Sequence, residues 1–572
     1  MTPASRPPGP RRLPPGLDWL WLLVCVLASS GWCLTAAAQL SATWDEPVYL
    51  RVGLERWRSG SYWSLLRLGT MPLPVDVQTL PLYVAERLRG LPFDPVADFD
   101  VILPWARAAT LLFWWLLLLY GWLAGWQLGG RWAGRLAVGL LASEPTLLAH
   151  ASLATTDVAV AACVLALVYH FRRGREASWR WRVGLPALWY AAAVLTKASG
   201  LVLGLSCLAV SEAERLVRAG ILRPAAGPGG SPLGRAWAGL RPFRRDVAQI
   251  VGLGLLVVFV YCGSDWRAEP TFVAWSRGLP EGPSRNTMIW VADHLRIFRN
   301  AGDGLVRQVK HNLRGRETFL LGRVYPRGVW YYFPTALTIK LTLTWLALPV
   351  LIALWRPRAL ANWACVLAAT LILLSVTFRV QLGIRFLLPL YAIAAVGLAA
   401  AAVQAIRESP PGWPRRMLVA AVGAGLAWTA VSAARVWPNG LSYTNELWGG
   451  TANGYRRLGD SNYDWGQGLK ELARWQAAHG IAALDVWYFG TDPSVGRPPM
   501  ARASFADGIA GPADVLDRVR GRYLAASTTL LYGKLPTDSE RRTAAFLRGR
   551  QPIGRTTTFF VYDFTKEPAP GS

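Results

Sequence analysis

Charged residues are scarce in this 572-residue chain: they make up 17% of it, while 53% is hydrophobic and the mean hydropathy is +0.25. A soluble protein of this length needs a far more polar surface. Trp is abundant, at 30 residues, and its ring suits the boundary between lipid and water. The composition therefore excludes an ordinary cytosolic or secreted enzyme and indicates an integral membrane protein.

Acidic residues are few relative to basic ones, 35 against 61, which gives a net charge of +26. In a soluble protein such an excess would indicate nucleic-acid binding. Here the basic residues fall in short loops between apolar runs, and no zinc-finger, RNA-binding or helix-turn-helix pattern is found. We therefore expect a lipid bilayer and no nucleic acid among the partners.

Cysteine and histidine are also sparse, with six and five residues. Every cysteine lies in an apolar segment and none forms a CxxC pair, which argues against disulfides and thiolate metal sites. Asp460 and Asp464, spaced i and i+4 in "GDSNYDWGQGL", permit either a metal site or a loop leading into a helix. The metal therefore stays unknown, and a divalent cation is possible but not required.

Apolar runs long enough to cross a bilayer recur over the first 437 residues. A helix of about 20 residues spans the hydrocarbon core. The run 184–211 is long for one span and short for two, and Ser199-Gly200 after Lys197 favours a tight hairpin. The other predicted spans lie near 17–38, 101–127, 132–152, 156–171, 247–263, 334–355, 360–378, 383–405 and 416–436.

The distribution of Lys and Arg over the loops sets the topology, because cytoplasmic loops carry the excess. With a cytoplasmic N-terminus and with 184–211 crossing twice, the inner loops hold 22 Lys and Arg against five Asp and Glu. A single crossing would move the basic loop 212–246 outside. We therefore expect about 11 transmembrane helices in the cytoplasmic (inner) membrane, the first of them an uncleaved anchor.

That topology leaves three large regions on the outer face, 39–100, 264–332 and 438–572. The expected fold class is a mainly α, polytopic membrane protein with a transmembrane domain over 1–437. Residues 438–572 are expected to form a small extracytoplasmic α/β domain. The first outer loop, 39–100, carries the candidate catalytic acids.

The tail has its own secondary-structure signals. Residues 464–481 place apolar side chains at helical spacing and end on His-Gly, a C-cap pattern. The segments 484–490, 521–533 and 556–564 have the composition of strands.

Two adjacent acids, Asp45 and Glu46, follow the first span in the motif "TWDEP". Helix capping accounts for one of them. Thr43 and Glu46 have capping-box spacing, and alternatively Pro47 at the first helical position would make Glu46 the cap. Asp45 has no such local role, so functional and structural interpretations both remain open for it.

Further ionisable residues lie at or inside the expected spans. Asp157 begins a span in "AHASLATTD", Glu144 lies inside one beside Pro145, and His150 lies between them. Such residues at membrane depth commonly face a cavity or a partner. The structural alternatives are a favourable helix N-terminus for Asp157 and a kink at Pro145 for Glu144.

Three cations lie towards the same outer leaflet: Lys197 in "VLTKASG", Lys340 in "WYYFPTALTIK" and Arg385 in "GIRFLLPLY". Snorkelling to the interface is the alternative for Lys197, and an aromatic belt is the alternative for Arg327 and Tyr332. Lys340 lies inside its span, beyond such a belt.

These groups together fit sugar transfer. A carboxylate can take the proton of a hydroxyl nucleophile, and cations can stabilise a leaving phosphate. An aromatic entrance beside the bilayer suits a lipid-borne substrate. Because Asp45 and Asp157 share the outer side with the three cations, we expect transfer from a polyprenyl-phosphate carrier, since nucleotide sugars are scarce there.

Five motifs taken in order resemble the GT-C superfamily of polytopic membrane glycosyltransferases over about residues 17–405. The nearest branch is the bacterial relatives of dolichyl-phosphate-mannose protein mannosyltransferases and lipid A aminoarabinose transferases. The tail stretch "YTNELWGG…YRRLGDSNYDWGQGLKEL" also resembles one found after the last span in one bacterial subgroup. The five motifs are "WDEP", "AHASLATTD", "LTKASG", "WYYFPTALTIK" and "GIRFLLPLYA".

The resemblance implies that Asp45 is the catalytic carboxylate and that Asp157 is a second acid lining the active cavity. Relatives often carry "HPPL" in the second half of the first loop, where this chain reads "TMPLPVDVQTLPLY" without the His. The role of that His, and with it the acceptor, is therefore open. The expected donor-binding residues are Glu46, Lys197, Tyr332, Lys340 and Arg385, and the other candidates are Glu144, His150, Arg327, Asp460 and Asp464.

The resulting hypothesis is an inverting glycosyltransferase in which Asp45 acts as general base on a hydroxyl of a lipid-linked glycan or protein. A transporter or flippase is one rival, but it would show paired broken helices in two symmetric halves, and no internal symmetry is visible. A non-enzymatic receptor is the other rival, and its function would depend on the ligand-binding tail 438–572 instead of Asp45.

Overall fold

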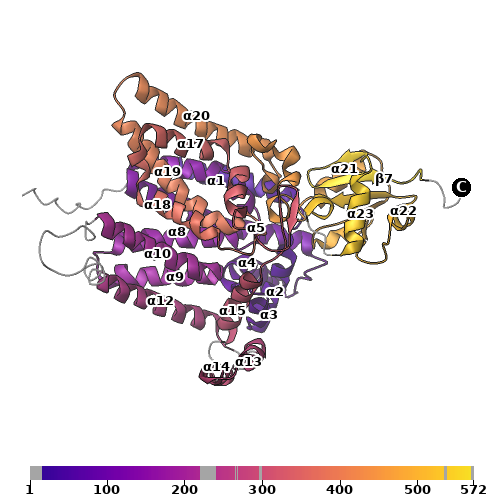
Figure 1. Cartoon of the computed structure of the whole chain (residues 1–572), viewed down its shortest axis with the longest axis horizontal. Helices are drawn as coiled ribbons and strands as arrows, with labels where there is room; N and C mark the ends of the chain where they lie inside the picture. Colours follow the sequence, from indigo (N-terminus) through magenta and orange to yellow (C-terminus); the bar gives the residue numbers. More distant parts are fainter. Residues whose placement is uncertain are drawn as a thin grey trace, which may run out of the picture.

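The computed structural model describes residues 16–218, 240–264, 266, 268, 270–294, 299–533 and 537–567. Most of these residues are helical. Long helices run side by side in one bundle, and a smaller unit that contains a sheet lies at one end of it (Figure 1).

The bundle is built from apolar helices joined by short connections. The bounds are α1 (Gly16–Gln39), α5 (Phe99–Gly129), α6 (Arg131–Ser143), α7 (Pro145–Ala151), α8 (Asp157–Gly174), α9 (Leu185–Thr196), α10 (Ser199–Arg218), α12 (Arg241–Cys262), α16 (Tyr332–Lys340), α17 (Leu343–Trp355), α18 (Trp363–Ser375), α19 (Leu388–Glu408) and α20 (Trp413–Val436). A π-helical turn, η1 (Arg180–Gly184), and two 3₁₀ turns, η3 (Pro357–Leu360) and η4 (Ile384–Leu387), connect some of them.

Five helices within the described residues are long and apolar enough to cross a membrane: α1, α5, α12, the continuous η4–α19 and α20. The pair α16 and α17 makes a sixth span if it counts as one, although it bends by 104° at the junction. The predicted count of about 11 is therefore not confirmed. Several expected spans are shorter helices, such as α6, α9 and α18 with 13, 12 and 13 residues.

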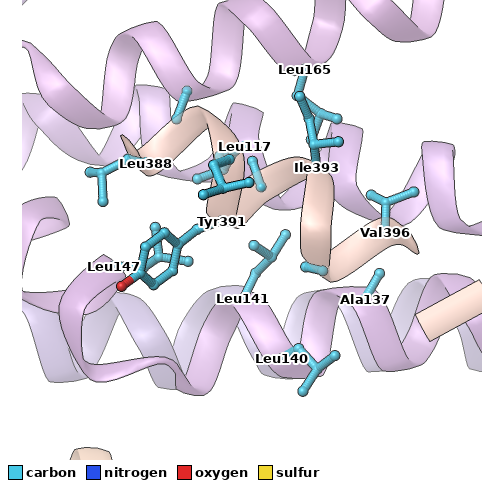
Figure 2. Close-up of a cluster of buried hydrophobic side chains, with 14 of the residues drawn as sticks. Leu117, Ala137, Leu140, Leu141, Leu147, Leu165, Leu388, Tyr391, Ile393 and Val396 are labelled. Carbon is cyan, nitrogen blue, oxygen red and sulfur yellow. The ribbon is translucent and has the colours of Figure 1, made fainter. Parts of the chain in front are cut away.

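Helices α8 and α19 lie at the centre of the bundle, where α19 contacts α5, α6, α8 and α18. Small side chains on α19 let its neighbours approach closely. A Cβ atom on Gly397 would lie 2.7 Å from the Cys365 backbone nitrogen in α18, so this packing requires glycine. Figure 2 shows the core side chains of Leu388, Tyr391, Ile393 and Val396 from α19 together with Leu117, Ala137, Leu140, Leu141, Leu147 and Leu165.

Helix breaks place polar residues at one end of the bundle. Glu144 separates α6 from α7, and Lys197 with the following residue separates α9 from α10. The predicted break in the run 184–211 thus exists, and the two helices contact each other. A Cβ atom on Gly200 would lie 2.1 Å from the Ala193 carbonyl oxygen, so the tight connection requires glycine there.

The segment after α1 and the segment after α12 form short elements at this end. Helices α2 and α4 pack together, and α3 packs on α15. The bounds are α2 (Glu46–Ser59), α3 (Trp63–Arg67), α4 (Pro72–Arg89), α13 (Pro270–Arg277), α14 (Pro283–His294), α15 (Arg299–Arg314), β1 (Thr318–Leu320) and β2 (Arg323–Tyr325). Strands β1 and β2 pair antiparallel.

After α20 the chain makes 3₁₀ turns and then forms a five-stranded sheet of order β4-β3-β5-β7-β6. Strand β3 is parallel to β4 and β5, and β7 is antiparallel to β5 and β6. The bounds are η5 (Gly440–Ser442), η6 (Glu446–Trp448), η7 (Thr451–Arg456), η8 (Asp460–Asn462), α21 (Leu469–Ala478), β3 (Leu484–Trp487), η9 (Pro493–Gly496), β4 (Met500–Ala503), α22 (Pro512–Val519), β5 (Tyr523–Ser527), η10 (Thr529–Gly533), α23 (Asp538–Arg548), β6 (Gly554–Arg555) and β7 (Phe559–Asp563).

The three predicted strands of the tail are found as β3, β5 and β7, and the predicted helix is α21, closed by Gly480 at φ +65°. One prediction was wrong: the second half of 521–533 is the π-helical turn η10, not a strand. The reason is a contact with a distant segment, because the Thr529 backbone nitrogen and the Thr528 hydroxyl both donate to the Asp464 carboxylate. These bonds turn the chain away from the sheet after Ser527.

Candidate active site

Four charged side chains from separate parts of the chain meet at the end of the bundle that faces the sheet. Arg385 Nη1 donates to Asp45 Oδ2 at 2.8 Å and lies 3.7 Å from Asp157 Oδ2. Lys197 Nζ forms an ion pair with Asp157 Oδ1. We call Asp45, Asp157, Lys197 and Arg385 the charged cluster. Its two negative and two positive charges sum to zero.

Each member of the charged cluster stands at the end of a helical segment. Asp45 is the N-cap of α2, Asp157 is the first residue of α8, Lys197 follows α9, and Arg385 lies in the 3₁₀ turn before α19. Asp45 makes no side-chain capping bond, so its carboxylate is available to Arg385. The Asp45 side chain keeps 22% of its surface exposed, whereas Asp157 has none exposed.

Aromatic rings lie against the two cations. The Phe386 ring centroid lies 4.4 Å from Lys197 Nζ and 5.3 Å from Arg385 Cζ, and Trp465 faces Arg385 at 4.2 Å. Rings hold cations by their π-face and keep water out. The His150 ring lies 6.4 Å from that of Trp465. Both ring nitrogens of His150 are buried without a hydrogen-bond partner among the described residues.

Tyr49 belongs to the same region, although sequence reasoning missed it. Burial and then the charge of Asp45 raise the pKa of the Tyr49 phenol, and its side chain hydrogen-bonds with Thr70. Residues at i and i+4 of a helix share a face. Tyr49 follows Asp45 by four positions at the start of α2. This spacing could have identified Tyr49 from the sequence.

Glu46, expected among the donor-binding residues, binds other groups of the protein instead. Its carboxylate accepts two hydrogen bonds from Arg107 at 2.8 Å and further bonds from Thr43 and the Ala154 backbone nitrogen. It has no exposed surface. Burial raises the pKa of a carboxyl group, but the charge and hydrogen bonds of Arg107 outweigh this and lower the pKa of Glu46. No oxygen of Glu46 is left for a ligand.

Lys340 lies beside the charged cluster but outside it. Its ammonium donates to the backbone carbonyl oxygens of Leu441, Tyr443 and Asn462 at 2.8, 2.6 and 2.9 Å. These bonds use all of its donors. Lys340 therefore fastens the segment after α20 to the bundle, and it has no donor left for a phosphate.

Tyr332 and Glu144 also have partners within the protein. The Tyr332 hydroxyl accepts a hydrogen bond from the Asn462 amide at 2.8 Å. Glu144 Oε2 accepts from the Leu147 backbone nitrogen and so caps α7. Both side chains are buried, which fits structural roles next to the charged cluster.

Arg327, Asp460 and Asp464 are not in the charged cluster. Arg327 is exposed after β2, and Asp464 has no exposed surface and accepts bonds from Gly466, Thr528 and Thr529. No group of three His, Cys, Asp or Glu side chains suited to a metal ion occurs in the part of the chain that is described. A small cavity of about 20 Å³ lies beside Asp460 and Tyr332. Its lining comprises Glu317, Thr318, Phe319, Tyr332, Gln381, Leu382, Gly459, Asp460, Thr529 and Gly533.

No family model and no curated protein matches the chain. Solved structures do match. ArnT from Cupriavidus metallidurans, bound to undecaprenyl phosphate and in the apo state, is 16% and 14% identical. These matches cover 96% of this chain and 97% and 98% of ArnT, with a TM-score of 0.42 in both.

The archaeal oligosaccharyltransferase AglB from Archaeoglobus fulgidus, in complex with an inhibitory peptide and a dolichol-phosphate, is 10% identical. That match covers 91% of this chain and 72% of AglB, with a TM-score of 0.44. At these TM-scores the likeness assigns no role to any residue of this chain.

Proposed function

We propose that the protein is a membrane glycosyltransferase that moves a sugar from a polyprenyl-phosphate donor to a hydroxyl of a lipid-linked glycan or protein. The charged cluster carries this proposal, because it joins a partly exposed acid to two cations that contact aromatic rings. An acid can take a proton and cations can hold a phosphate, which are the two requirements of this transfer.

The transfer is a single displacement. The Asp45 carboxylate takes the proton of the acceptor hydroxyl, and the acceptor oxygen attacks the anomeric carbon of the donor. The bond between that carbon and the phosphate oxygen breaks, and polyprenyl phosphate leaves with the electron pair. Attack from the side opposite the phosphate inverts the anomeric configuration.

Arg385 stabilises charge on both sides of this step. In the resting protein it pairs with Asp45 at 2.8 Å. When Asp45 takes up the proton it becomes neutral, and at that moment the leaving phosphate gains charge. Arg385 then has a new anionic partner without having to move far, and Lys197 supplies a second positive charge, so little reorganisation is needed.

Asp157 holds the two cations in place. It is fully buried and lies between Lys197 and Arg385. A buried carboxylate paired with two cations offsets their mutual repulsion. We therefore assign Asp157 an orienting role toward the donor site. The outer face of the cytoplasmic membrane remains the proposed location of the reaction.

The test has two stages. Mass spectrometry of envelope glycans, lipids and proteins from cells with and without the protein identifies the product. Proteoliposomes with the corresponding polyprenyl-phosphate sugar then separate transfer from flipping. We expect the wild type to transfer sugar and Asp45→Asn to lose about 100-fold or more of the rate. Glu55→Gln, an exposed acid on the same helix, is the matched control. Flipping without transfer by the wild type would overturn the proposal.

A further inference from the structure

The ten residues 459–468, "GDSNYDWGQG", lie against the charged cluster although they follow Arg385 by more than 70 positions in the sequence. We call this segment the strap. The Trp465 side chain is 2% exposed and faces the Arg385 guanidinium at 4.2 Å. The Trp465 ring also faces the His150 ring, with the two ring centroids 6.4 Å apart. The strap thus forms one wall of the cluster.

The strap also binds the loop that carries Asp45. The Ser41 backbone nitrogen donates to the Gln467 carbonyl oxygen at 3.0 Å, and the Trp44 backbone nitrogen donates to the Trp465 carbonyl oxygen at 3.0 Å. Trp465 therefore holds the residue before Asp45 with its backbone, while its side chain covers the partner of Asp45.

The same strap fastens the turn that carries Arg385. The Ile384 backbone nitrogen donates to Asn462 Oδ1 at 2.8 Å, and the Ser461 hydroxyl donates to the Leu382 carbonyl oxygen at 2.7 Å. Both sides of the Asp45–Arg385 ion pair are thus fixed by one short segment. The loop of Asp45 and the turn of Arg385 are each already joined to a helix by the chain itself. The bonds to the strap therefore fix the position of Asp45 relative to Arg385.

A second loop of the C-terminal sheet region supports the same arrangement. Asp492 Oδ2 accepts from the Ala42 backbone nitrogen at 2.7 Å, and the Thr491 hydroxyl donates to the Trp44 carbonyl oxygen at 2.8 Å. The Trp44 ring stacks on Phe489 with centroids 5.0 Å apart. The loop of Asp45 is therefore held on its open side by the C-terminal region.

From these contacts we propose that Trp465 is a positioning residue of the reaction, and that the C-terminal region completes the active site through the strap. This inference rests on the proposed function. The indole keeps the guanidinium plane of Arg385 in register with Asp45. It also shields the Arg385 side of the ion pair from water and ions, while the Asp45 carboxylate stays partly exposed. Charge interactions in a dry site are stronger than in water, so the loss of the ring weakens the contribution of Arg385 to the reaction.

The chemistry predicts a graded series of variants. Trp465→Phe keeps a smaller π-face over Arg385, while Trp465→Leu keeps apolar volume without one. We expect kcat to fall a few-fold for Trp465→Phe and about tenfold for Trp465→Leu, in line with a desolvated cation–π contact. KM should change less, because the proposed role of Trp465 is to position Arg385 and not to bind a substrate.

The dependence of kcat on salt concentration distinguishes a positioning role of Trp465 from a merely structural one. With the ring gone, ions also reach the Arg385 side of the Asp45–Arg385 pair and screen it more strongly than in the wild type. The kcat of Trp465→Leu should therefore fall as NaCl is raised to about 0.5 M, while that of the wild type stays nearly constant.

The experiment uses the full-length protein in lipid nanodiscs with the donor and acceptor identified as above. Trp475→Leu is the matched control, because Trp475 lies in α21 of the same region and stacks on His479 with centroids 4.0 Å apart, away from the cluster. We expect it to keep the wild-type kcat and salt response.

The outcomes separate this inference from the proposed function. If the wild type transfers no sugar, the proposed function is wrong. If the wild type transfers and Trp465→Leu equals it at every salt concentration, or Trp475→Leu shows the same loss and salt response, only the positioning role is wrong. If Trp465→Leu does not fold, Trp465→Phe against Trp475→Phe decides: a loss in the first alone supports the role, and equal rates overturn it.

Discussion

The carboxylates of Asp45 and Glu46 are adjacent in the chain but have different environments. Glu46 is sealed by Arg107, Thr43 and the Ala154 backbone nitrogen, while Asp45 keeps 22% of its side chain exposed and meets Arg385. A fully bonded, fully buried carboxylate has no lone pair for a substrate proton. Glu46 therefore stabilises the loop after α1 through its hydrogen bonds, whereas Asp45 belongs to the charged cluster.

Removal of the Glu46 charge should destabilise the protein. Glu46→Gln leaves Arg107 buried without an anion, and breaking a buried pair in this way costs about 3–5 kcal/mol. We expect a lower melting temperature and less folded protein in a fluorescence-detected size-exclusion assay. Glu55→Gln, exposed on the same helix, should change stability by less than about 0.5 kcal/mol. A stable but inactive Glu46→Gln protein would contradict the structural role and point to chemistry at Glu46.

Lys197 and Lys340 should differ in phosphate binding. Undecaprenyl phosphate, a lipid of the polyprenyl-phosphate class proposed as the leaving group, serves as the probe. Lys197→Met removes a cation of the charged cluster, and a lost bond to a charged group weakens binding about tenfold or more. Lys340→Met instead frees the carbonyl oxygens of Leu441, Tyr443 and Asn462.

The Lys340→Met protein should therefore melt at a lower temperature, while the Kd of its folded fraction for undecaprenyl phosphate should rise less than that of Lys197→Met. Binding is measured on purified full-length protein, and thermal unfolding is recorded in parallel. An unchanged Kd for Lys197→Met together with a weakened one for Lys340→Met would reverse the assignment.

Gly383 offers a test of how the strap sits against the bundle. A Cβ atom at this position would lie 2.1 Å from the Ser461 hydroxyl, so Gly383→Ala overpacks the contact at a cost of about 1–3 kcal/mol. We expect lower transfer activity and a lower melting temperature.

Ser461→Gly in the same chain removes the clashing hydroxyl and should restore part of both. The four proteins form a double-mutant cycle, and residues in contact give a non-additive result. Strictly additive effects of the two substitutions would show that the strap does not contact the turn of Arg385 in solution.

Much of the fold could be predicted because apolar runs and turn residues act locally. Strands β3, β5 and β7 and helix α21 follow from alternation, helical spacing and the Gly480 cap. The number of spans could not be predicted in the same way. Hydropathy averages over a break, so the predicted span 132–152 runs through the end of α6 at Glu144, although Pro145 indicates a kink there. Likewise, hydropathy does not reveal that α16 and α17 bend by 104°.

The charged cluster was partly visible in the sequence, since Asp45, Asp157, Lys197 and Arg385 each stand beside an apolar run. Their pairing was not visible, because it depends on contacts across the whole bundle. Lys340 resembled a phosphate ligand for the same reason: its carbonyl partners lie 101 to 122 positions away. Trp465 was missed because its motif also fits a loop that leads into a helix.

Asp464 should make the stability of the C-terminal region depend on pH. Burial raises the pKa of its carboxyl group to about 7, against an ordinary value of 3.8, despite bonds from Thr529, Gly466 and Thr528. Between these two values the folded state binds a proton that the unfolded state does not. Stability is therefore greatest at the acidic end and falls as pH rises from about 4 to about 7.

The whole effect of this single group is at most about 4 kcal/mol. Hydrogen exchange in α21 and β5, followed from pH 7 downwards, should show rising protection of both elements. Asp464→Asn cannot lose a proton, so its profile should lose most of this slope. Asp485→Asn, a partly exposed acid of β3 paired with Arg522, is the control and should keep the slope. An identical pH profile for wild type and Asp464→Asn would mean that Asp464 stays ionised in the folded protein across this range.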